Sequence, residues 1–296
     1  MEGLRRRSAR RLSGLRLPYP FDLDLLCDEV AASRGRPLHR RPLAGLKAGA
    51  PCGLWLGMPT ADYVFYDPGT SPLHAEHIVL HEIAHILCGH AAGPAHGDLV
   101  ARLFPDLDPA LVARMLGRAG HTTAQEREAE MLASMIRTAG SPARDRAWPR
   151  TRRRVRTVLA AYRMLIVLRP LWSAMRSAFP EVVLWRPARS AVELRGVAGV
   201  RLRLYRRVIE IRDGMLALRD HLPAGTAPEG AAAEARAIAA ALSRLAAGEP
   251  PADPPGRWAP VGPDMADEIA WLSRVSVAYR ALNEGAPTPT PAGSAR

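Results

Sequence analysis

The chain of 296 residues has only three cysteines, Cys27, Cys52 and Cys88. An odd number of widely spaced cysteines does not make a disulfide framework and is typical of a protein that keeps its thiols reduced. The N-terminal arginines are not followed by an apolar segment, so the sequence predicts no secretory signal. These two absences together predict a cytoplasmic protein.

Long hydrophobic runs are also missing. The best candidate for a membrane span, residues 158–168, is interrupted by Arg163 and followed by Arg169. Because a transmembrane helix needs about 20 consecutive apolar residues, we expect no membrane span. With 48% hydrophobic and 24% charged residues, the composition is that of a globular protein. A chain of this length most often folds into two domains.

Lysine is nearly absent, since Lys47 is the only lysine among 41 basic residues. The net charge of +12 is compatible with nucleic-acid binding. Arginine is spread along the whole chain, however, which indicates a compositional bias rather than a phosphate-binding patch. We interpret the one dense cluster, at 150–156, as a linker or the solvated start of a helix. No nucleic-acid partner is therefore expected. A basic DNA-associated regulator ranks below the two functional hypotheses that the motifs favour.

The chain is organised around the sequence His-Glu-Ile-Ala-His at 81–85. On an α-helix His81 and His85 project from the same face. Two imidazoles held in this way can bind one metal ion at the roughly 2.0–2.1 Å that zinc prefers. Glu82 is placed instead to take a proton from a water molecule at the metal, as in zinc peptidases. Apolar neighbours on both sides indicate that this helix, expected at about 72–89, is buried.

Other potential ligands lie close to this motif. We expect His74 and His77 to be polar residues near the start of the helix, because His77 is two turns away from His85. His90 is rotated away from the pair, so a structural or supporting role is expected. Cys88 lies among apolar residues and is interpreted as a buried structural thiol.

A catalytic zinc site needs three protein ligands and one open position, so a further ligand must come from another segment. The helix predicted at 124–138 carries Glu126, Glu128 and Glu130. One alternative is a charged solvent-exposed face, but the apolar residues that follow cover most of the helix circumference. A helical wheel slightly favours Glu128 over Glu126, so spacing alone does not identify the ligand.

Before the helix expected at 72–89, the spacing of apolar residues predicts a helix over 22–34, capped by Asp22, and a weak strand at 37–43. Two stronger strands, 53–57 and 61–66, are separated by a tight turn and predict a hairpin. In zinc peptidases an exposed strand edge above the metal helix can hold an extended peptide through backbone hydrogen bonds. The predicted hairpin lies in the right place for this role.

The 81–85 motif, followed by Glu-x-x-Ala-Glu-x-x-Ala at 126–133, resembles the ImmA/IrrE family of small zincin-like metallopeptidases over roughly residues 20–140. In that family the second block reads Glu-x-x-Ala followed by Asn or Asp, and its first Glu is a metal ligand. The chain departs from this pattern at Glu130, where it has Glu instead. The Leu-Leu-Met-Pro that often follows in the family is also absent.

The resemblance implies a site with one Zn²⁺ ion, and Mn²⁺ is also compatible with such ligands. The implied metal ligands are His81, His85 and Glu126, and the implied catalytic residue is Glu82. The implied activity is that of a gluzincin-like endopeptidase that cleaves a helix-turn-helix transcriptional repressor. The alternative is a non-catalytic metal-binding regulatory or toxin–antitoxin-type interaction protein.

The sequence of the second half of the chain predicts a series of helices. Segments 169–181 and 202–214 resemble the cytoplasmic C-terminal domain of a family of multi-pass bacterial membrane proteins of unknown function. This resemblance implies a sensor or protein-docking role, and the alternative is a helical cap that only stabilises the N-terminal domain. The expected fold class is α+β, a small zincin-like domain followed by a mostly helical one. The expected organisation is a metallopeptidase-like domain at 1–140, a basic linker at 141–154, a helical domain at 155–285 and a disordered tail at 286–296.

Overall fold

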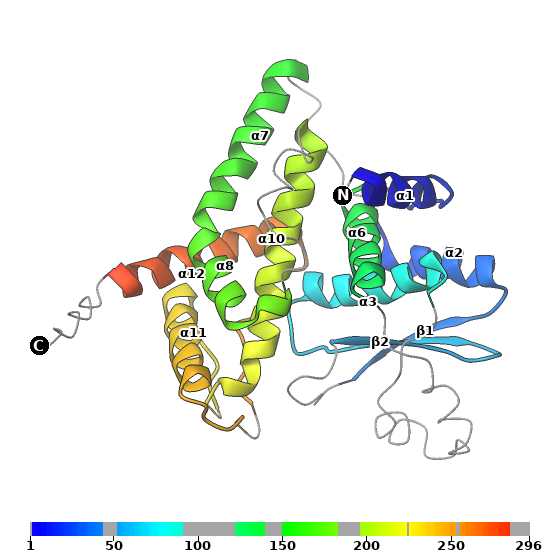
Figure 1. Ribbon diagram of the computed structural model, residues 1–296. Coiled ribbons are helices and arrows are strands. Elements are labelled where there is room, and N and C mark those ends of the chain that lie inside the picture. The colour runs from blue at the N-terminus through cyan, green and yellow to red at the C-terminus, as the bar shows by residue number, and fades with distance from the viewer. Residues whose placement is uncertain are drawn as a thin grey trace, which may run out of the picture.

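The computed structural model describes residues 2–43, 52–90, 122–139, 150–182, 196–223, 225–252 and 255–284. The fold is α+β, mostly helical with a small three-stranded sheet, as predicted. Figure 1 shows the sheet with α1, α2, α3 and α6 on one side of the molecule, and α7, α8, α10, α11 and α12 on the other. We call these the N-terminal half and the helical half.

The N-terminal half begins with two helices, α1 (Glu2–Ser13) and α2 (Leu23–Arg34). The Asp22 side chain caps α2 by accepting a hydrogen bond from the backbone N–H of Leu25 at 3.0 Å. The helix ends at Gly35, whose φ of 65° is the left-handed conformation that glycine adopts without strain. The predicted helix and its cap are therefore present.

The sheet contains β1 (Leu38–Pro42), β2 (Gly53–Gly57) and β3 (Asp62–Tyr66) in the order β1-β3-β2. β2 and β3 form the predicted antiparallel hairpin, and β1 pairs with β3 in parallel. Among the described residues β2 pairs only with β3, so it is an edge strand of this sheet.

Helix α3 (Pro72–Cys88) lies along one face of the sheet, and α6 (Thr123–Ala139) packs on α3 (Figure 1). The Ser71 hydroxyl caps the start of α3, and Gly89, with a φ of 68°, ends it. Apolar side chains from the sheet and from α2, α3 and α6 form one hydrophobic core. This core holds the 81–85 motif against α6, the helix that carries Glu126, Glu128 and Glu130.

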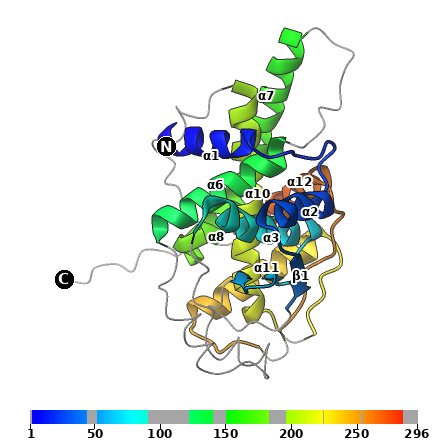
Figure 2. The same ribbon diagram turned by 90° about the vertical axis from the view of Figure 1, so that its right-hand side faces the viewer.

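The helical half is built from five helices and two short 3₁₀ turns among the described residues. They are α7 (Arg150–Val167), α8 (Arg169–Ala178), η1 (Pro180–Val182), α10 (Gly196–Leu218), η2 (Arg219–His221), α11 (Ala231–Ala246) and α12 (Met265–Glu284). Figure 2 shows that α7 rises beyond the rest of the molecule. Side chains from α7, α8, α10, α11 and α12 form a second hydrophobic core.

The expected basic linker is partly helical, because α7 already begins at Arg150. The rest of that linker, 141–149, and the expected disordered tail, 286–296, lie outside the described residues. In the described part of the chain no single helix is long and apolar enough to cross a membrane. Residues 156–167 and 169–178 reach the required length and composition only as a pair that is bent by 50°.

The two halves are in direct contact, because α10 packs against both α3 and α6. Leu73 at the start of α3 belongs to the core of the helical half, and Met131 of α6 packs with Leu202 of α10. Arg219, just beyond α10, donates hydrogen bonds to both carboxylate oxygens of Asp67 at 3.0 and 2.9 Å. The position of α10 is therefore defined relative to the helix that carries the motif.

The close approach of β2 to α3 gives a first prediction. A Cβ atom added at Gly53 would lie 2.6 Å from Ile78 Cγ2 and 2.8 Å from Glu82 Oε1. Gly53→Ala is therefore expected to displace Glu82 and to lower the free energy of unfolding by about 1–3 kcal/mol, measured by urea denaturation. Gly57→Ala is the matched control at the other end of β2, where the nearest atoms lie at an ordinary 3.4 Å. Equal stability of the two variants would contradict the packing described here.

Candidate metal centre

Two imidazoles and one carboxylate converge where α3 packs against α6. His81 Nε2 and His85 Nε2 lie 3.0 Å apart. Glu126 Oε2 lies 3.1 Å from His81 Nε2, and Glu126 Oε1 lies 3.7 Å from His85 Nε2. Ligand atoms in a tetrahedral zinc site with bonds of about 2.0–2.2 Å are separated by about 3.3–3.6 Å. The observed separations lie within a few tenths of an ångström of this range, so the three side chains could hold a single metal ion after small adjustments.

The electrostatics of this cluster favour a cation. Burial by itself lowers the pKa of His81, but hydrogen bonds with Glu126 and Glu130 and the charges of Glu130 and Glu82 outweigh it. The pKa of His81 is consequently raised well above its ordinary value. Negative charge that attracts a proton also attracts a divalent cation, so metal binding and protonation compete at these imidazoles.

Glu82 lies beside this cluster rather than in it. It is buried on the side of α3 that faces β2, where the absence of a side chain at Gly53 leaves room for its carboxylate. It directly follows His81 along α3, and its charge is among the causes that raise the pKa of His81. Glu82 is thus a buried carboxylate beside the candidate metal ligands, and its catalytic role stays a prediction.

The structure distinguishes the three glutamates of α6. Glu126 faces the two imidazoles, whereas Glu128 Oε1 lies 3.6 Å from Arg7 Nε and 3.5 Å from an Arg11 guanidinium nitrogen. Glu130 is buried on the other side of His81. The geometry therefore favours Glu126 as the third ligand, which is the residue that the family resemblance implied and not the one that the helical wheel favoured.

A second group of potential ligands, Cys88, His90 and Glu128, lies close by, with donor atoms within 4.8 Å of one another. This group is less suited to a metal ion. Burial raises the pKa of the Cys88 thiol to about 11, so the thiol stays protonated at neutral pH. The Glu128 carboxylate already has two arginines of α1 as counterions.

His90 contacts the motif from its far side. Its Nδ1 lies 3.0 Å from Nδ1 of His85, and its Nε2 lies 3.6 Å from Glu128 Oε2. When His85 binds a metal ion through Nε2, its remaining proton is on Nδ1 and can be donated to His90. The structure thus places His90 beside the candidate ligand His85, with its own Nε2 on the side of Glu128.

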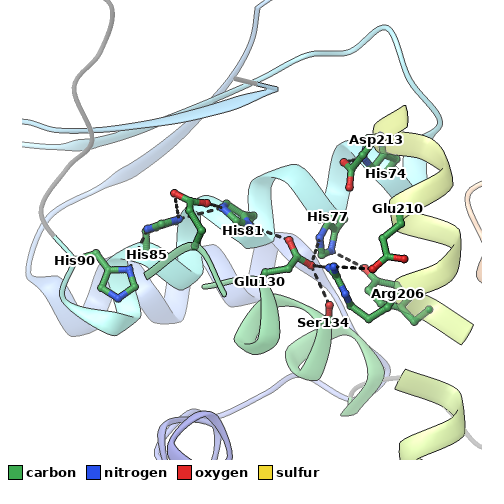
Figure 3. A network of polar contacts seen from close by, with 12 residues as sticks. His74, His77, His81, His85, His90, Glu130, Ser134, Arg206, Glu210 and Asp213 are labelled. Atoms are coloured by element: carbon green, nitrogen blue, oxygen red, sulfur yellow. Dashed lines mark hydrogen bonds and ion pairs between the residues drawn. The ribbon is translucent and has the colours of Figure 1, made fainter. Parts of the chain in front are cut away.

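On the opposite side of the centre, Glu130 lies between His81 and Arg206 (Figure 3). Glu130 Oε2 lies 3.0 Å from His81 Nδ1. Burial raises the pKa of Glu130, but the charges of Arg206 and His77 and hydrogen bonds from His77 and His81 lower it well below its ordinary value. This carboxylate is therefore ionised in the folded protein.

His74 and His77 are not merely polar residues near the start of α3, as expected, but are buried at the contact with α10. His77 Nδ1 lies 3.0 Å from the hydroxyl of Tyr205, and His74 Nε2 lies 2.8 Å from Asp213 Oδ1. The residues on α10 were missed as neighbours of the site. The only sequence signal was a set of charged residues within an otherwise apolar helix, and this signal does not name their partners.

The geometry gives a second prediction, which concerns the third ligand. Glu126→Gln is expected to weaken Zn²⁺ binding by more than about 100-fold, since loss of a supporting group alone costs about 10–100-fold. Glu128→Gln, the same change two residues further along α6, is expected to leave Zn²⁺ affinity nearly unchanged. Competition of the purified variants with a chromogenic chelator measures both affinities. The opposite ranking of the two variants would show that Glu128 is the ligand.

Comparison with known proteins finds a match that covers nearly all of the helical half. Residues 154–281 match a family of unknown function (DUF6545). No curated protein and no solved structure matches the chain. The match agrees with a separate C-terminal helical module and assigns no activity to it.

Proposed function

We propose that this protein is a zinc-dependent endopeptidase of the ImmA/IrrE type. One observation carries the proposal: two imidazoles from one turn of α3 and the Glu126 carboxylate of α6 converge, and Glu82 lies next to the first imidazole. His81, His85 and Glu126 make up the three-ligand set of a catalytic zinc site, in which a fourth position stays open. Mn²⁺ remains compatible with these ligands.

A zinc ion held by these residues supplies Lewis acidity, which acidifies water and polarises a peptide carbonyl. Glu82 accepts a proton from the attacking water molecule and then donates it to the nitrogen of the departing amine. Its burial beneath β2 shields this proton transfer from bulk solvent. His81 and His85 are held by Glu130 and His90, so the ligands are oriented before a substrate binds.

The edge strand β2 suits the binding of an extended peptide. Its only partner among the described residues is β3, and its first residue, Gly53, lies against Glu82. A peptide that pairs with β2 by backbone hydrogen bonds would pass over the face of α3 that carries the catalytic carboxylate. As substrate we propose a helix-turn-helix transcriptional repressor, on the family resemblance alone, and we propose that the helical half senses or docks a partner.

One observation favours an alternative, a non-catalytic metal-binding regulator. The metal ligands are connected to α10 through buried polar contacts, so a bound ion would also stabilise the packing of the two halves. In such a protein the ion has a structural function, and Glu82 has no role in chemistry. The two functions differ in what the loss of the Glu82 carboxylate does.

Glu82→Gln gives the third prediction. The amide keeps the size of the side chain but cannot accept the proton, so cleavage of the repressor is expected to fall by about 10²–10⁴-fold, while Zn²⁺ content stays the same. Gel analysis of a purified repressor encoded beside the gene, incubated with zinc-loaded protein, measures the cleavage. Glu76→Gln is the matched control, because Glu76 is on the same helix but pairs with Arg137. Equal cleavage by wild-type and Glu82→Gln proteins would exclude the proposed mechanism.

A further inference from the structure

We propose that Arg206, on α10 of the helical half, positions the metal ligand His81 through Glu130, and that the helical half thereby sets the metal affinity of the centre. The inference rests on the metal site of the proposed function and deepens it, because it names what controls that site. It does not depend on peptide cleavage. Arg206 does not touch the metal site itself, so it is a positioning residue.

The first step is the contact between Glu130 and His81. A neutral imidazole carries one proton, and the carboxylate oxygen 3.0 Å from His81 Nδ1 favours a proton at that nitrogen. The lone pair is then on Nε2, the nitrogen that faces Glu126 and His85. Glu130 thus selects the tautomer and the ring orientation that a metal ion requires.

The second step is the contact between Glu130 and Arg206. The Arg206 guanidinium forms an ion pair with Glu130 Oε1, while the other carboxylate oxygen contacts His81. The Ser134 hydroxyl donates to the same Oε1 at 3.1 Å, and His77 Nε2 lies 2.8 Å from it. Ser134 and His77 belong to the N-terminal half, so Arg206 is the contact through which the helical half acts on this carboxylate. Without Arg206 the carboxylate loses its guanidinium partner and keeps only Ser134 and His77 at Oε1, so Oε2 is held less firmly opposite His81.

The third step is the anchoring of Arg206 in the helical half. A second guanidinium nitrogen of Arg206 lies 3.3 Å from Glu210 Oε1. The indole N–H of Trp172, on α8, donates to Glu210 Oε2 at 2.7 Å. A continuous series of buried polar contacts therefore leads from α8 through α10 to His81. Figure 3 shows its part from Glu210 to His81.

The same helix contacts α3 at two further points. Tyr205 contacts His77. Asp213 pairs with His74, as Figure 3 shows. Helix α10 is therefore held along α3 and cannot shift without altering the surroundings of Glu130. By linkage, anything that changes the position of α10 changes metal affinity, and metal binding in turn stabilises the docked position of α10.

The fourth prediction compares two arginines of α10 in the full-length chain. Arg206→Met removes the ion pair with Glu130 and is expected to weaken Zn²⁺ binding by about 10–100-fold. The matched control is Arg212→Met, because Arg212 also forms a buried ion pair, with Glu268 of α12, at 2.9 and 2.7 Å. Arg212→Met is expected to lower thermal stability but to keep Zn²⁺ affinity within about twofold of the wild type.

Zn²⁺ affinity is measured by chelator competition with the metal salt alone. The visible spectrum of the Co²⁺-substituted protein provides a second readout, because the d–d bands report the ligand geometry and not the overall stability. These bands are expected to change in Arg206→Met and to stay like those of the wild type in Arg212→Met. Arg206→Lys retains the charge but not the forked geometry, and it is expected to recover part of the lost affinity.

Each outcome decides the inference. Unchanged affinity and spectrum in Arg206→Met would overturn it, and so would equal losses in the two Met variants, which would show a general effect of destabilisation. If Arg206→Met does not fold, Arg206→Lys and Arg212→Lys form the test, and a loss in the first variant alone supports the inference. A wild-type protein that does not bind Zn²⁺ would refute the metal site of the proposed function. This outcome is distinguishable from the results above, in which the wild type binds Zn²⁺ and only the variants differ.

Discussion

The packing of α3 against α6 is the contact on which the rest of the structure depends. It places His81 and His85, one turn apart on the first helix, opposite Glu126 on the second. The apolar side chains around this contact are almost fully excluded from water, so the polar groups between the helices must find partners within the protein. They do so by contacting one another, and the resulting cluster of imidazoles and carboxylates has donor atoms at separations suited to a metal ion.

The same constraint explains the contact between the two halves. Burial of the Glu130 carboxylate is unfavourable unless a cation is nearby, and Arg206 supplies it from α10. A buried ion pair of this kind contributes little to net stability compared with apolar packing, but it is costly to break on one side only. Its effect is therefore to define one arrangement of α10 relative to α3. Because Glu130 also contacts His81, the interface between the halves and the candidate metal centre share this carboxylate.

This organisation bears on how a protease-like module and a helical module work together. Glu82, the proposed catalytic carboxylate, and the edge strand β2 lie on the side of α3 that faces the sheet, whereas α10 contacts the N-terminal part of the helix. Substrate binding and control by the helical half would thus use different surfaces of the same helix. Control through the orientation of one imidazole needs only a small movement, since a shift of the Glu130 carboxylate is enough to remove its contact with His81.

The sequence by itself determined the local elements of the N-terminal half and predicted which residues form the candidate site. Capping residues and periodicity set the bounds of α2 and α3, and the spacing of His81 and His85 on one helical face follows from helix geometry alone. Spacing could not choose between Glu126 and Glu128, because the two side chains point to different sides of α6 and only the packing of α6 on α3 decides which side meets the imidazoles. The buried roles of His74 and His77 and the part played by Arg206 were decided by the tertiary structure alone. The partners of His74 and His77 lie more than a hundred residues away on α10, and Glu130, the partner of Arg206, lies 76 residues away on α6. Local sequence does not show which of these buried polar groups meet.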